Sequence, residues 1–169
     1  MQNSSMTFLR RLEAKHDQYL RHVEQFNTAL THLQYEGLPR RKHNIQRVEK
    51  MTRILEKDLL PHMTEDRDIV FPFLAKHVPR LEPVMGVFNG EHDEFLESFE
   101  QFKTILSNLH SYDAQPQADQ LLTNLHVKGT YLYCLIRNHL YAEHECVVKV
   151  ISRELQPREL KELEILLKN

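Results

Sequence analysis

Glycine is scarce in this chain, and long apolar runs are missing from it. Four glycines in 169 residues is few, and the common residues are instead Leu, Glu, Lys, Arg and Gln, which favour helices. No apolar run approaches the ~20 residues that span a bilayer. The first residues, MQNSSMTF, lack the basic-then-apolar pattern of a signal peptide. We therefore expect a helical protein without a membrane segment.

Cysteine is also scarce, and there is no strong net charge of either sign. Cys134 and Cys146 are twelve residues apart in what is predicted to be one helix, or ~18 Å at 1.5 Å per residue, which is too far for a disulfide. The chain has no CxxC motif, which excludes a zinc ribbon and a thioredoxin-like redox site. Two unpaired thiols favour a reducing cytoplasm. A net charge of −2 gives no reason to expect nucleic acid as a partner.

Four long stretches carry apolar residues at alternating steps of three and four, which is typical of amphipathic helices in a bundle. They span about 5–33, 41–76, 83–110 and 118–153, with a loop in the polar segment SYDAQPQADQ. Pro61 predicts a kink in the second helix, and Pro157 suits the start of a short closing helix. We predict a single all-α domain over 1–169. It is an antiparallel up-down four-helix bundle (about 5–153) with a closing helix (about 157–168).

Histidine is abundant, with eleven copies, and four of them occupy apolar positions of the predicted helices. The two on the second and fourth helices are each followed, four residues later, by a carboxylate that shares the same helix face. These six candidate site residues are His16, His62, Asp66, His92, His139 and Glu143. The other seven histidines fall outside this pattern, and we expect them at the surface: His22, His32, His43, His77, His110, His126 and His144.

An internal repeat relates the two halves of the chain. HDQYLRHVEQF from His16 aligns without gaps on HDEFLESFEQF from His92, 76 residues later. HMTEDRDIV from His62 aligns on HLYAEHECV from His139, 77 residues later. The chain is thus two copies of a helical hairpin. Counted from the connecting turns at 1.5 Å per residue, the four histidines fall within about one helical turn of each other in height.

The same repeat favours Asp66 over the adjacent Glu65 as the site carboxylate. In the alignment, Asp66 corresponds to Glu143, whereas Glu65 corresponds to Ala142. Burying two ionised carboxylates in a helical core costs several kcal/mol each unless something compensates their charge. A pair of divalent cations supplies that compensation. Neutral imidazole and carboxylate oxygen are ligands that suit iron, manganese or zinc, so the sequence predicts a dinuclear metal site.

The stretches LLPHMTEDRDIVFPFL, GEHDEFL and RNHLYAEHE resemble the hemerythrin-like, or HHE cation-binding, family over roughly His16 to Val148. The resemblance implies a non-haem di-iron centre with an oxo or hydroxo bridge, with iron favoured over zinc or manganese. It also implies that the six candidate residues are the ligands and that the two carboxylates bridge the metals.

The chain departs from its family at two positions. Oxygen-carrying members have a second histidine where this chain has Leu96, so the chain is more similar to the branch with four histidines and two carboxylates. That branch includes the iron–sulfur-cluster-repair proteins and the hemerythrin domain of the F-box iron sensor. Members usually have Glu where this chain has Asp66. The aspartate side chain is one methylene shorter than that of glutamate. Asp66 therefore either bridges two metals or binds one, and Glu65 stays open as the alternative ligand.

The resemblance implies that the centre binds O2, NO or peroxide for sensing, storage or stress response, in a monomer or a homodimer. The alternative is an enzyme that reduces NO or peroxide, or one that delivers iron in cluster repair. We favour a binding protein, because the sequence places no obvious general acid beyond the ligands. Tyr19, Tyr133 and Cys146 are candidates for a supporting role around the site.

Two further classes of metalloprotein fit less well. A ferritin-like carboxylate protein would carry Glu-x-x-His on two helices, whereas only Glu13-x-x-His16 occurs here. A dinuclear zinc hydrolase stays open as an alternative, because ligand spacing alone does not choose the metal.

Overall fold

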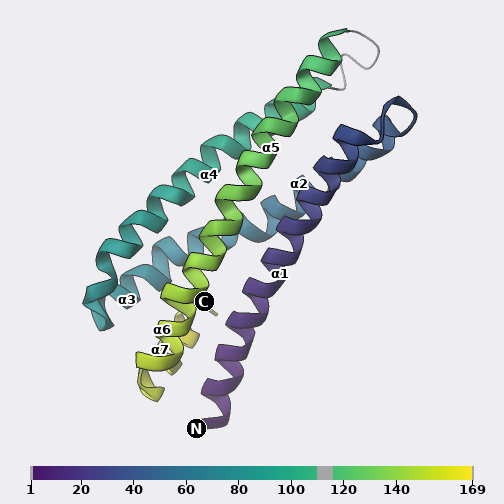
Figure 1. Ribbon diagram of the computed structural model, residues 1–169. Coiled ribbons are helices and arrows are strands. Elements are labelled where there is room, and N and C mark those ends of the chain that lie inside the picture. Colours follow the sequence, from purple (N-terminus) through teal and green to yellow (C-terminus); the bar gives the residue numbers. More distant parts are fainter. Residues whose placement is uncertain (1, 110–115, 169) are drawn as a thin grey trace.

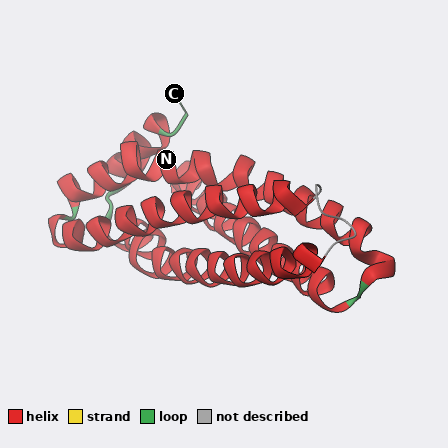
Figure 2. Cartoon of the chain, turned by 90° about the horizontal axis from the view of Figure 1, so that it is seen from above, coloured by secondary structure: helices red, strands yellow, loops and turns green. Residues whose placement is uncertain are grey.

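The computed structural model describes residues 2–109 and 116–168. Within these ranges the regular elements are all helices, and no strand is found (Figure 2). The first two rods are α1 (Gln2–Tyr35) and a continuous run of α2 (Arg41–Glu65), the π-helical η2 (Asp66–Val70) and α3 (Phe71–His77). The next two are α4 (Glu82–Leu109) and a run of α5 (Pro116–Glu143), the π-helical η5 (His144–Val148) and α6 (Lys149–Glu154). The closing helix is α7 (Pro157–Leu166).

The four rods form an antiparallel bundle, as predicted. α1 lies along α2 and along α5, and α4 lies along α5 (Figure 1). Short 3-10 turns, η1 (Leu38–Arg40) and η3 (Pro79–Leu81), stand in the connections. The chain reverses after α1 at Gly37, whose φ of 73° lies in the left-handed region that glycine adopts without strain.

Two apolar clusters fill the core, one in each half of the bundle. The larger cluster, towards the Gly37 turn, includes Phe95. The smaller cluster, under α7, includes Phe88 and Leu163. On α4, His92 lies between Phe88 and Phe95, so the polar residues of the candidate site occupy the boundary between the two clusters.

The π-helical segments shift the buried face of two rods by one residue. The regular spacing predicts Ile69 and Cys146 on the buried stripes, but both are only half-buried. Their neighbours Val70 and Val147 are buried instead, at 5% and 1% exposure. A π turn closes its hydrogen bonds five residues apart rather than four, so every position after it moves round the helix by one residue.

Smaller departures from the prediction concern helix ends and histidines. α2 continues through Pro61 without interruption, and the break in α-helical hydrogen bonding comes one turn later, at Asp66. α5 begins at Pro116, so the end of the predicted loop is helical, and the rest of that loop lies outside the described residues. Of the histidines predicted at the surface, His43 is exposed, His110 lies outside the described residues, and the others are half-buried. No described helix is both long and apolar enough to cross a bilayer.

Candidate metal centre

The side chains of the candidate site converge on one oxygen atom, Glu143 Oε2. His62 Nε2 lies 3.2 Å from it, and His16 Nε2 and His139 Nε2 each lie 3.7 Å from it. His92 Nε2 is in turn 2.9 Å from His139 Nε2. Each of the four rods therefore supplies one imidazole, and all four present the same ring nitrogen to the centre of the bundle.

Asp66 belongs to this cluster, whereas Glu65 stands at its edge. Asp66 is 3% exposed, and its Oδ2 lies 3.2 Å from His62 Nδ1. The two groups are not aligned for a hydrogen bond, so this buried oxygen has no hydrogen-bond partner. Glu65 is half-buried and lies 3.5 Å from Lys15 Nζ. The structure thus brings Asp66, rather than Glu65, together with His62.

Burial sets the protonation of the site without metal. Desolvation lowers the pKa of His16 and of His92 to about 3, and it also lowers the pKa of His139. Desolvation raises the pKa of Glu143 to about 8 and that of Asp66 well above its usual range. At neutral pH the site therefore offers neutral imidazoles with free lone pairs, and it holds protons on its carboxyl groups that a cation would displace.

Glu91 is a functional candidate that the sequence reasoning missed. His139 Nδ1–H donates a hydrogen bond of 2.7 Å to Glu91 Oε2. The proton on Nδ1 leaves a lone pair on Nε2, the atom that faces the site, and a carboxylate behind a metal-binding histidine commonly fixes this tautomer. The one hint in the sequence is that Glu91 directly precedes His92.

The residues present fit a bound cation. His16, His62 and Glu143 each offer a ligand atom within 4.8 Å of the other two, which forms one potential position. The Nε2 atoms of His92 and His139 face each other beside it, 2.9 Å apart. Asp66 contributes an unpartnered buried oxygen. Such a set of neutral imidazoles and enclosed carboxyl oxygens suits first-row transition metals.

The two π-helical segments lie where the carboxylates are. Asp66 is the first residue of η2, and Glu143 is the last residue before η5. π turns are uncommon and are found often at functional sites. Both halves of the sequence repeat therefore keep the same irregularity next to the same site position.

Aromatic rings surround the imidazoles. The Tyr19 ring is 4.8 Å from that of His62 between centroids, so Tyr19 does lie against the site. Tyr133 instead donates hydrogen bonds of 3.1 Å to Glu24, and Cys146 packs against the smaller apolar cluster. Of the three supporting candidates from the sequence, only Tyr19 has a described contact with the six site residues.

These features define a helical-bundle protein with a buried cluster suited to cations. The family model of the hemerythrin HHE cation binding domain matches residues 7–151, and the chain belongs to this family. The match ends within α6 and leaves α7 outside. Searches of curated proteins and of solved structures found no match.

Proposed function

We propose that this protein holds a dinuclear iron centre in the middle of its bundle. The observation that carries the proposal is the convergence of three Nε2 atoms on Glu143 Oε2, with a fourth beside them. His16 and His62 would bind one iron, and Glu143 would lie between the two. The full ligand set would be His16, His62, Asp66, His92, His139 and Glu143, which is the four-histidine, two-carboxylate set of one branch of the family.

The proposed centre binds a small ligand, O2, NO or peroxide, for sensing, storage or stress response. Bound iron supplies Lewis acidity and redox chemistry at an open coordination position. The chain contributes four imidazoles, two carboxyl groups, and an apolar surrounding that limits the access of water. Cys134 and Cys146 are free, as predicted, and we propose that the protein works in the cytoplasm, where thiols stay reduced.

An enzyme that reduces NO or peroxide is the second candidate, and Tyr19 is the residue that favours it. Its ring contacts His62, and burial raises the pKa of its hydroxyl, so the group keeps its proton beside the site. Turnover of NO or peroxide by the iron-loaded protein, well above that of free iron, would favour the enzyme. Stoichiometric binding without turnover would favour the sensor or carrier.

Metal analysis of the purified protein tests the proposal. We expect about two irons per chain and a near-ultraviolet charge-transfer band from an oxygen bridge to iron. His62→Ala and His139→Ala should each lose iron while keeping most of their helical circular dichroism. The matched control is His43→Ala, which removes an exposed histidine and should keep full iron content. The proposal fails if wild-type protein loaded with Fe(II) under anaerobic conditions retains no more iron than the two site variants.

A further inference from the structure

A cavity of about 170 Å³ adjoins the candidate metal centre. Four of the six site residues form its inner end: His16, His62, Asp66 and Glu143. The other two histidines, His92 and His139, are not among its lining residues, and each meets an aromatic ring. The Phe71 ring stacks on His92 at 5.8 Å between centroids, and the Phe88 ring meets His139 edge-on at 5.1 Å. This cavity therefore opens onto the position at His16 and His62.

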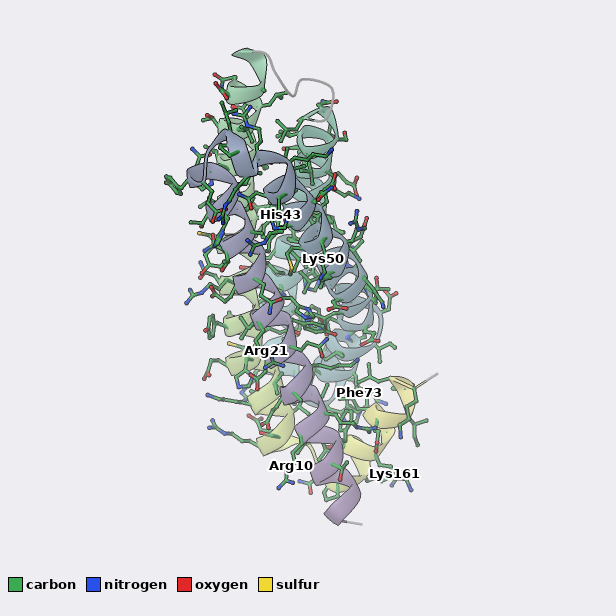
Figure 3. All side chains as sticks on the ribbon, turned by 90° about the vertical axis from the view of Figure 1, so that its right-hand side faces the viewer. Arg10, Arg21, His43, Lys50, Phe73 and Lys161 are labelled. Carbon is green, nitrogen blue, oxygen red and sulfur yellow. The ribbon has the colours of Figure 1, made fainter. Side chains whose placement is uncertain are left out.

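The walls of the cavity are apolar and come from both ends of the chain. Leu12 of α1, Val147 of η5 and Ile151 of α6 line it, together with Leu163 of α7. α7 packs against α1, and Figure 3 shows this helix, which carries Lys161, beside the part of α1 that carries Arg10. Since the family match ends at residue 151, the wall that α7 supplies lies beyond the matched domain.

The rim of the cavity is charged, with a small excess of cations. Arg11 and Lys168 both pair with Glu164, and Lys15 lies 3.5 Å from Glu65. The three basic side chains are more than half exposed. Three cations against two carboxylates do not repel an entering anion, and bound metal ions at the inner end would attract one.

The volume indicates a ligand larger than a diatomic molecule. An apolar cavity of about 150 Å³ is enough to hold benzene, so this one has room for about six carbon atoms. Dioxygen, nitric oxide or peroxide would leave most of its apolar wall without contacts.

We propose that the cavity binds a small organic acid, with an apolar body of about six carbon atoms against α1 and α7 and its carboxylate on the metal held by His16 and His62. The position of the carboxylate rests on the proposed iron centre. The position of the apolar body rests only on side chains of this chain. The two parts can therefore be tested separately.

Three probes separate the contribution of the carboxylate from that of the apolar body. Hexanoate has both groups, acetate has the carboxylate without the apolar body, and hexanol has the apolar body without the carboxylate. Binding to the iron-loaded protein is followed by calorimetry and by the near-ultraviolet band. Each buried methylene contributes about fourfold in affinity, so hexanoate should bind at least tenfold more tightly than acetate. Both acids should perturb the band. Equal affinity for hexanoate and acetate, or hexanoate binding that leaves the band unchanged, would overturn the proposal.

A cavity-filling variant locates the apolar body. Leu163→Phe should reduce hexanoate affinity to that of acetate while leaving iron content and acetate affinity as in wild type. Leu166→Phe is the matched control, because Leu166 is on the same helix but 42% exposed, and it should bind hexanoate as wild type does. If Leu163→Phe does not fold, Leu12→Phe fills the cavity from α1 instead. Unchanged hexanoate affinity in the filled variant would place the body elsewhere and end the proposal.

The metal-free protein distinguishes failure of this inference from failure of the iron centre. Hexanol should raise the melting temperature of the metal-free wild type but not that of Leu163→Phe. If the protein binds no iron yet shows this difference, the cavity stands as the site of the body, while the carboxylate position is wrong together with the proposed function. If iron binds but hexanol gives no such difference, the iron centre stands and the cavity inference is wrong.

Discussion

Glu91 fixes the orientation of one imidazole of the site, although it is not among the six predicted residues. It accepts the Nδ1–H of His139 from the neighbouring helix. His16 and His92, by contrast, have buried Nδ1 atoms without a hydrogen-bond partner. Among these three imidazoles, that of His139 is thus the one whose tautomer is set by a carboxylate before any metal arrives.

We predict that Glu91→Gln weakens metal binding about 10- to 100-fold, the usual cost of losing a carboxylate behind a ligating histidine. The amide is nearly the same size but is a weaker acceptor for the Nδ1 proton. Competition with a chelator of known affinity measures the effect. Glu97→Gln, an exposed change on the same helix, should bind metal as wild type does. Equal metal affinities for the two variants would show that the hydrogen bond from His139 to Glu91 does not affect metal binding.

The choice between Asp66 and Glu65 is decided by two matched amide variants. Asp66→Asn should lower the metal content to about one ion or less per chain, because it removes a buried anionic oxygen from the cluster. Glu65→Gln should keep the wild-type content, because its carboxylate is at the edge beside Lys15. Plasma emission spectrometry on protein loaded with Fe(II) measures both. The reverse result would assign the ligand role to Glu65.

At the scale of elements, Gly129 marks a close approach between helices. A Cβ added there would lie 2.6 and 2.8 Å from the two methyl carbons of Leu30 and 3.0 Å from Phe102. Leu30 is 1% exposed and Phe102 is fully buried, so both contacts lie inside the packed core. Glycine at this position lets α5 approach α1 and α4 closely.

We predict that Gly129→Ala lowers the free energy of unfolding. Overpacking costs about 1–3 kcal/mol, which exceeds the gain of up to about 1 kcal/mol in helix propensity. Gly86→Ala on α4 is the matched control, since an added Cβ there meets no atom within 4 Å. That change should stabilise the protein by about 0.5–1 kcal/mol. Urea unfolding of both variants compares them, and a stabilised Gly129→Ala would mean that Leu30 can move aside.

Sequence periodicity predicted the four rods because amphipathic spacing is a local property of the chain. It failed after Asp66 and after Glu143, where the π-helical segments move the buried face from Ile69 to Val70 and from Cys146 to Val147. No propensity marks such a segment. Its place depends on packing in three dimensions rather than on local preference.

The six candidate residues could be selected together because the repeat sets their register. Glu91 could not, since its partner His139 is 48 residues away on another helix and the contact depends on ring orientation. The cavity could not be predicted either. It exists because α7 folds back on α1, a contact that leaves no periodic signal in either helix.

At the scale of the whole molecule, the metal-free site makes stability depend on pH in two opposing ways. Burial lowers the pKa of His16 and His92 from 6.5 to about 3. Their contribution is complete above pH 6.5 and is lost as the pH falls towards 3. Burial raises the pKa of Glu143 from 4.5 to about 8. Its contribution is complete below pH 4.5 and is lost as the pH rises towards 8.

Metal-free protein should therefore lose stability between pH 6.5 and pH 8. The loss from the two carboxyl groups exceeds the small gain that comes as His16 and His92 of the unfolded chain, half protonated at pH 6.5, lose their remaining protons. Each group contributes about 1.4 kcal/mol per pH unit, so Glu143 alone accounts for about 2 kcal/mol, and the raised pKa of Asp66 adds to the fall. Metal-loaded protein should not show this loss of stability, since the cation has already displaced these protons.

Urea unfolding at both pH values, with and without metal, measures the difference. Glu143→Gln has no proton to lose, so its metal-free form should show a smaller fall than wild type. A metal-free wild type equally stable at pH 6.5 and pH 8 would mean that water reaches these carboxyl groups and that the cluster is open before metal binds.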